Sequence, residues 1–223
     1  MGALQCPELV PYTIIGFDFP GCGGSPYPEH ASYTMEDLVE ITHLVVTALH
    51  IKKCVIIGHS MGGLVGLLFA RKYPHNLAGF INVEGNLAPE DCFASRTISQ
   101  QSLDDFEKKG FPRLIKDIRQ SSNKGLQKIA KTLQEHTSPK ALHDCSHSLV
   151  HYSDSGKLLE WFIQLTIPKI FMYGSENSHL SYIPVLRQQG VSVVEIKDSG
   201  HFPCYDNPEE YWDQVLTHLL EMK

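Results

Sequence analysis

The sequence predicts an α/β protein with a mostly parallel sheet, because short apolar strand-like runs alternate with helical patterns along the chain. Cys54–Ile57 is an apolar run that leads through a glycine-rich turn into a helical segment. Phe80–Val83 and Val191–Ile196 have the apolar and β-branched composition of buried strands. A chain of 223 residues buries a core of its own, so we expect a single domain over residues 1–223.

The turn after Cys54–Ile57 reads Gly58-His59-Ser60-Met61-Gly62-Gly63 and matches the pattern G-x-S-x-G. Between a strand and a helix, this pattern holds a serine hydroxyl above the carboxyl end of a parallel sheet. Glycines suit the turn because it leaves no room for Cβ atoms before and after the serine, and because the helix packs closely on the sheet. The helix should end at Lys72-Tyr73-Pro74, since the residue before a proline disfavours the helical conformation. Ser60 is therefore the candidate nucleophile.

His201 is the candidate general base among the 12 histidines. It lies in a predicted loop, Asp198–Pro203, directly after the strand Val191–Ile196. A last helix should begin at Asn207-Pro208, with asparagine as the N-cap and proline at the first helical position. This loop lies at the carboxyl end of its strand, where ligands bind in open α/β sheets.

Two further segments complete a family pattern. Ile14–Ser25 resembles a strand that ends in an aspartate and a glycine-rich turn, and Tyr33–Leu38 resembles the helix start that follows it. With the serine turn and the histidine loop, the chain resembles the α/β-hydrolase superfamily, in its single-domain form with a helical cap. The resemblance implies a serine hydrolase with a Ser-acid-His triad in chain order and Met61 N–H as an oxyanion donor. A serine at the turn disfavours the related dehalogenases and epoxide hydrolases, which use aspartate there.

The triad acid is left open by the sequence. The family's usual aspartate position corresponds here to Asn177, which carries no charge to stabilise an imidazolium. Glu176 is its neighbour in the chain. Glu84 follows the strand Phe80–Val83, and some relatives carry their acid at that place. We favour Glu84, with Glu176 and the absence of a functional acid as alternatives.

The same resemblance implies that the N-terminal part of the family fold is incomplete. Met1–Thr13 is too short for the family's first strands and contains no His-Gly loop for a second oxyanion donor. The absent strand would lie between the strand ending at Asp18 and the strand ending at Ile57. We expect either an incomplete isoform, fragment or gene model, or a shift of Tyr12–Phe17 into the vacant position.

Residues 88–165 interrupt the alternation and contain only helical patterns, the clearest being Leu126, Ile129, Ala130 and Leu133. Such an insertion is expected to form a cap over the carboxyl edge of the sheet. His143, His147 and His151 recur every four residues here. Because no carboxylate or thiolate completes a closed set, solvated or capping histidines are expected rather than a metal site.

Composition narrows the possible partners. A net charge of −6 without a basic cluster argues against a nucleic-acid partner. The sequence also contains no run of 18 apolar residues, which a membrane-spanning helix would require. The opening residues lack the features of a signal peptide, so a cytoplasmic location is expected. The sequence therefore predicts a cofactor-independent serine hydrolase acting on a small carbonyl substrate, or alternatively a non-catalytic binding module of the same fold.

Overall fold

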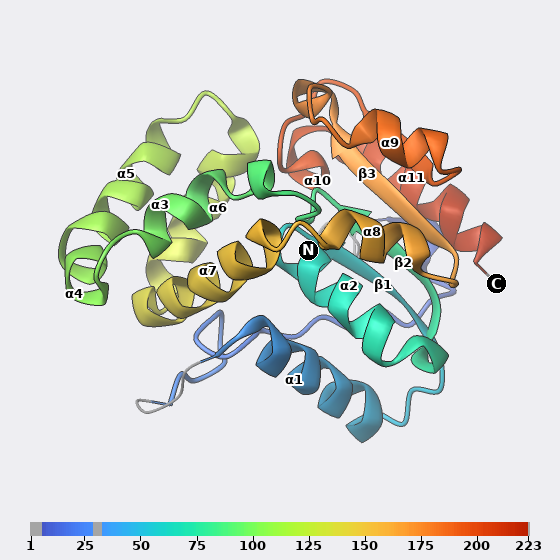
Figure 1. Cartoon of the computed structure of the whole chain (residues 1–223), viewed down its shortest axis with the longest axis horizontal. Coiled ribbons are helices and arrows are strands. Elements are labelled where there is room, and N and C mark those ends of the chain that lie inside the picture. Colours follow the sequence, from blue (N-terminus) through green and yellow to red (C-terminus); the bar gives the residue numbers. More distant parts are fainter. Residues whose placement is uncertain (1–5, 29–32, 223) are drawn as a thin grey trace.

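The computed structural model describes residues 6–28 and 33–222, and its centre is a four-stranded sheet (Figure 1). All three strand pairings are parallel, and the order is β1-β2-β3-β4. The predicted α/β fold with a parallel sheet is therefore confirmed. The strands are β1 (Cys54–His59), β2 (Leu77–Val83), β3 (Lys169–Gly174) and β4 (Ser192–Ile196).

Helices cover both faces of this sheet. One face contributes Phe80 and Phe171 to a large apolar core under four helices. The opposite face contributes Ile81 and Met172 to a second core under a single long helix at the C-terminal end. This division follows from the alternation of side chains along a strand. The four helices are α1 (Met35–Ala48), α2 (Met61–Lys72), α8 (Leu158–Gln164) and α9 (Ile183–Gln188), and the single helix is α11 (Pro208–Glu221).

The predicted helix starts are formed. Thr34 and Asp37 exchange side-chain and backbone hydrogen bonds in a capping box at the start of α1. Asn207 accepts a hydrogen bond from the Glu210 N–H at the start of α11. Both caps satisfy backbone donors that the first helical turn leaves unpaired. Short helical turns lie between the longer elements: η2 (Pro7–Leu9), η3 (Pro74–Asn76), η6 (Ser175–Asn177) and α10 (Pro203–Asp206).

The segment between β2 and β3 is mostly helical, and its part before α8 lies to one side of the sheet (Figure 1). Its outer part has a small apolar core of its own around Phe106 and Ile115. Its inner part joins the main core through Leu149 on α7 and Phe162 on α8. The elements before α8 are η4 (Pro89–Asp91), α3 (Phe93–Ser99), α4 (Leu103–Asp105), the π-helical turn η5 (Phe106–Gly110), α5 (Phe111–Gln120), α6 (Lys124–His136) and α7 (Pro139–Asp154).

The expected strand near Ile14–Phe17 is not formed. The segment has no regular secondary structure and no ladder partner among the described residues. It lies across a groove from β1, so it has not moved into the position beside that strand. Without a neighbouring strand edge within hydrogen-bond reach, its β-branched composition does not produce a strand.

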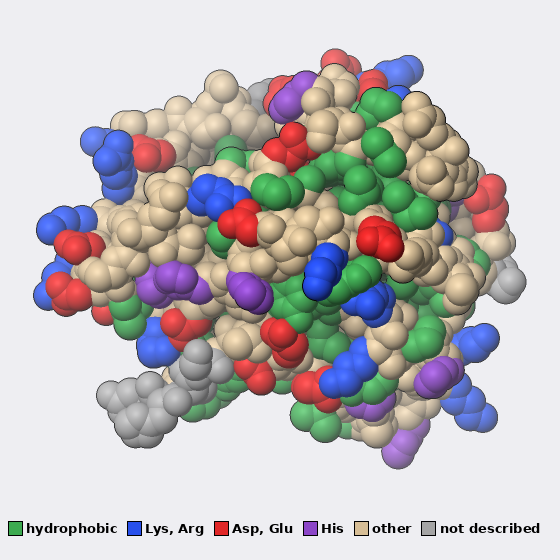
Figure 2. Space-filling model, viewed as in Figure 1, with side chains coloured by type: hydrophobic (Ala, Val, Ile, Leu, Met, Phe, Trp, Pro, Cys, Tyr) green, Lys and Arg blue, Asp and Glu red, His purple; other side chains and the backbone are tan. Residues whose placement is uncertain are grey.

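The surface shows charges of both signs scattered over the visible face, with no basic patch gathered over one element (Figure 2). Within residues 6–28 and 33–222, every helix is too short or too polar to cross a lipid bilayer.

Candidate active site

Ser60 occupies the tight turn between β1 and α2. Its backbone angles, φ 52° and ψ −121°, lie in a region that residues with a side chain rarely adopt. A Cβ on Gly58 would lie 2.3 Å from the Gly62 carbonyl oxygen, and one on Gly63 would lie 2.6 Å from Gly85 Cα. Gly62, by contrast, has open space where its Cβ would be. The expectation that a Cβ would not fit is therefore confirmed at Gly58, before the serine, and at Gly63, where the helix packs on the sheet. It is wrong for Gly62, after the serine.

Glu84 occupies the corresponding position after β2, the neighbouring strand. It too has a positive φ, 52°, and only 7% of its surface is exposed. Its Oε1 accepts hydrogen bonds from Gly174 N–H at 2.7 Å and from Asn177 Nδ2 at 3.0 Å. Asn177 Nδ2 also lies 3.0 Å from Oε2. Three donors, from the last residue of β3, from the turn after it and from the histidine loop, thus converge on this buried carboxylate.

His201 is the third donor. It lies in the loop after β4, and its Nδ1 is 3.3 Å from Glu84 Oε2. Because a carboxylate accepts, this contact places the imidazole proton on Nδ1 and leaves Nε2 as the acceptor. The side chain of His201 is 19% exposed, while that of Glu84 is 5% exposed. The imidazole therefore has one edge on a buried carboxylate and the other toward the open side of the site.

The alternative acids are placed differently. Glu176 is exposed, and its carboxylate makes no hydrogen bond within the described part of the chain. Its backbone N–H donates to the Ser199 carbonyl, and its carboxylate lies beside the backbone of Gly200 without a hydrogen bond to His201 among the described residues. Asn177 contacts Glu84 rather than His201, as a hydrogen-bond donor. Of the three candidates, the structure brings only Glu84 to the histidine.

Two polar groups at the serine turn, the Ser60 hydroxyl and the Met61 N–H, are unpaired within the described part of the chain. Over residues 6–28 and 33–222, the Ser60 hydroxyl has no hydrogen-bond partner, so its expected contact with His201 is not formed in this structure. In unliganded sites such contacts are often long and tighten when substrate binds. The Met61 N–H, at the first residue of α2, also has no acceptor among the described residues. An unpaired N–H at a helix start suits a developing negative charge.

His59 was not identified from the sequence. Its Nε2 lies 2.6 Å from the His201 backbone carbonyl, so this nitrogen donates. Burial, with a smaller contribution from nearby His201, lowers the pKa of His59 to about 3. The neutral ring therefore ties the serine turn directly to the histidine loop. Its position as the variable residue of G-x-S-x-G gives no signal of this role.

Phe93, at the start of α3, was also missed. Its ring meets the His201 ring edge-on with centroids 5.4 Å apart, and 63% of its surface is exposed. An exposed aromatic ring beside the candidate base places the helical segment at the mouth of the site. A single phenylalanine in a polar stretch gives no sequence pattern from which this contact could be predicted.

The loop from Glu84 into the helical segment is held by carboxylates. Asp91 accepts hydrogen bonds from the backbone N–H groups of Leu87 and Ala88 and from the Tyr182 hydroxyl. Burial raises the pKa of Asp91 to about 6. Glu90 accepts from both the N–H and the hydroxyl of Ser181. These bonds fix the base of the segment to the loop before α9.

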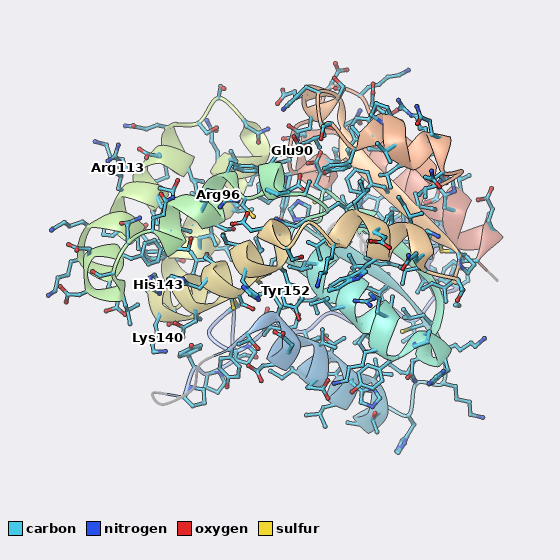
Figure 3. All side chains as sticks on the ribbon, in the orientation of Figure 1. Glu90, Arg96, Arg113, Lys140, His143 and Tyr152 are labelled. Carbon is cyan, nitrogen blue, oxygen red and sulfur yellow. The ribbon has the colours of Figure 1, made fainter. Side chains whose placement is uncertain are left out.

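Arg96 joins two helices of the segment. It forms a bidentate ion pair with Asp154, which links α3 to the end of α7. Arg96 also lies near Glu90, at the inner end of the segment (Figure 3). The histidines of α7 are not all solvated: His143 is 7% exposed, and its Nε2 contacts the Gln101 carbonyl at 2.9 Å. His143 is therefore buried rather than solvated, and its contact is with a backbone carbonyl just beyond the end of α3. Within the described residues, His, Cys, Asp and Glu side chains form no cluster of three suited to a metal ion.

Comparisons with known proteins identify the family of the fold. Residues 6–208 match the family model of the alpha/beta hydrolase fold. The chain therefore belongs to the α/β-hydrolase fold family.

Curated relatives match a smaller part. The chain is 32% identical over 89 residues to a putative carbamate hydrolase RutD of Pantoea ananatis (strain LMG 20103), covering 38% of this chain and 32% of that protein. It is 36% identical over 98 residues to the protein of the same name from Stutzerimonas stutzeri (strain A1501), covering 41% and 37%. The matched segment thus spans about a third of the length of these relatives.

Solved structures match nearly the whole chain. A thermophilic esterase from Thermogutta terrifontis superposes with a TM-score of 0.73 at 21% identity, covering 91% of this chain and 77% of the other. A hydrolase from Pseudomonas aeruginosa PA01 gives a TM-score of 0.73 at 18% identity, covering 97% and 83%. At such identities the likeness shows the fold alone.

Proposed function

We propose that this protein is a serine hydrolase in which Ser60, His201 and Glu84 form the catalytic triad. The observation that carries the proposal is the contact of His201 Nδ1 with the buried Glu84 carboxylate, beside a serine held in a strained strand-to-helix turn. Residues 1–223 act as one domain, and the helical segment 88–165 acts as its cap.

The chemistry follows from which atoms are free. Ser60 Oγ attacks the substrate carbonyl carbon while His201 Nε2 removes its proton, and Glu84 stabilises the resulting imidazolium. Met61 N–H donates to the oxyanion of the tetrahedral intermediate. His201 then protonates the leaving group, which departs from an acyl-enzyme on Ser60. Water, activated by the same imidazole, hydrolyses that ester and regenerates the serine.

The substrate class is a small molecule with an activated carbonyl group. The names of similar proteins, a carbamate hydrolase and an esterase, favour carbamates and esters among such substrates. Phe93 beside His201 supports an apolar group on the substrate near the leaving-group side, because an exposed aromatic ring gains from covering apolar surface.

A fluorophosphonate probe tests the proposal. We expect stoichiometric labelling of the folded chain at Ser60, found by peptide mass spectrometry, and complete loss of labelling in Ser60→Ala. Ser178→Ala, at an exposed serine outside the site, is the matched control and should label normally. Absence of labelling in a folded sample would refute the triad and favour the alternative, a non-catalytic binding module.

A further inference from the structure

The outer edge of β1 borders a groove. β1 is the first strand in the sheet order, so among the strands of residues 6–28 and 33–222 only one of its two edges is paired. The groove has a volume of about 320 Å³, and its lining extends along β1 from Cys54 to His59 and on to Gly62. The facing wall is the irregular segment around Ile15, Gly16 and Phe17.

The hydrogen-bonding direction along β1 is fixed by its partner. Ser60 N–H donates to the Val83 carbonyl, so Ser60 faces β2. In a parallel pair this direction alternates, so Gly58 and Ile56 also face β2. The N–H and C=O groups of Val55, Ile57 and His59 therefore point into the groove. Across the described residues, none of these groups has a hydrogen-bond partner.

The facing wall also carries backbone groups without hydrogen-bond partners in the described part of the chain. Its backbone from Thr13 to Phe17 makes no hydrogen bond within the described part of the chain. Ile15 and Phe17 are 44% and 40% exposed, and Ile57 on the β1 side is 38% exposed. Two walls thus present unpaired backbone groups and uncovered apolar side chains to one narrow space.

We propose that this groove binds a single extended apolar peptide strand, which pairs with the free edge of β1. Only an extended backbone repeats donors and acceptors at the spacing of Val55, Ile57 and His59, and about five residues cover that length at roughly 3.3 Å each. The edge strand of another folded sheet fits poorly, because one edge of that strand is already paired within its own sheet. This groove has a wall on each side, so its occupant needs two free edges. A lone strand has two free edges, and its apolar side chains would cover Ile15 and Ile57.

Amide hydrogen exchange followed by NMR tests the proposal in two stages. In the free chain, the amides of Val55, Ile57 and His59 should exchange much faster than those of Ile56 and Gly58. The probes are capped hexapeptides of alternating valine with threonine, isoleucine or phenylalanine. A binding peptide should slow the three exposed amides by at least about tenfold, because they enter a strand ladder. The same peptide with N-methyl groups on alternate residues, which removes the pairing N–H groups, should have no effect.

Two variants locate the binding. Ile15→Lys should abolish the peptide effect, whereas Leu44→Lys, at a residue of α1 that is 64% exposed and lies outside the groove, should preserve it. Unchanged exchange of the β2 amides shows in each sample that the fold is intact. Amides at Val55, Ile57 and His59 that are already protected in the free chain would overturn the proposal. So would a peptide panel that leaves their exchange unchanged.

Discussion

Replacing Glu84 by glutamine tests the assignment of the triad acid. In the wild-type chain, the carboxylate and a protonated His201 would be unit charges 3.3 Å apart. At an effective dielectric constant of about 20, this attraction amounts to about 5 kcal/mol. If that stabilisation develops only in the transition state, Glu84→Gln should lower kcat by roughly 10³- to 10⁴-fold.

The hydrogen bonds of Glu84 also predict a lower kcat for Glu84→Gln. Gly174 N–H and Asn177 Nδ2 both donate to Oε1 of Glu84, so the glutamine oxygen would take that position. The glutamine NH₂ would then face His201 Nδ1 as a donor. The imidazole proton would have to move to Nε2, which could no longer accept the proton of Ser60.

The assay is hydrolysis of a simple activated ester, with kcat and KM measured separately for each variant. KM should change little in Glu84→Gln, because the carboxylate lies behind the imidazole. Glu176→Gln is the matched control and should retain full activity. Asn177→Ala should lower kcat only mildly, since Glu84 keeps its hydrogen bonds to Gly174 and His201. A loss in Asn177→Ala or Glu176→Gln that exceeds the loss in Glu84→Gln would refute the assignment.

Two stability predictions follow from other residues. Burial raises the pKa of Asp91 to about 6 from 3.8, so the folded chain holds this proton more tightly than the unfolded chain. The stability from that proton is present below about pH 4 and is lost as pH rises to about 6, by up to about 3 kcal/mol. In urea unfolding, Asp91→Asn should therefore gain stability relative to wild type across this window, and parallel pH curves would contradict the reasoning. Ser60→Gly should relieve the backbone strain at φ 52°, of about 1 to 3 kcal/mol, less the entropy of a glycine. Its Tm should exceed that of Ser60→Ala by a few degrees, and equal Tm values would show that the turn is unstrained.

Much of the sheet half could be predicted from the sequence because its signals are local. The run from Cys54 into the serine turn, the capping box at Thr34 and the Asn207-Pro208 helix start each lie within a few residues. The parallel direction of the strands followed from their alternation with helices along the chain. The prediction at Ile14–Phe17 was wrong because composition alone does not form a strand when no neighbouring edge is available to pair with it.

The candidate site was predictable in its residue types but not in its contacts. Ser60 and His201 each follow a recognisable strand, and the missing charge at Asn177 directed attention to Glu84. The contacts of His59 with the His201 carbonyl and of Phe93 with the His201 ring join segments more than a hundred residues apart. Nothing in the neighbouring sequence specifies such pairings, because the strand order of the sheet sets them.

The backbone strain of this chain is concentrated where its chemistry is proposed. Within the described residues, positive φ outside glycine occurs at His50, Ser60, Glu84 and Asp198. Ser60 and Glu84 directly follow adjacent parallel strands, at the same edge of the sheet. A residue in ordinary strand geometry would direct its side chain to a face of the sheet, into the helices that cover it. The positive φ instead turns each side chain over the carboxyl edge of the sheet. There His201 contacts Glu84, and in the proposed reaction it also accepts the proton of Ser60. Such strain persists only where surrounding structure holds it, here the closely packed Gly58 and Gly63 and the donors of Gly174 and Asn177.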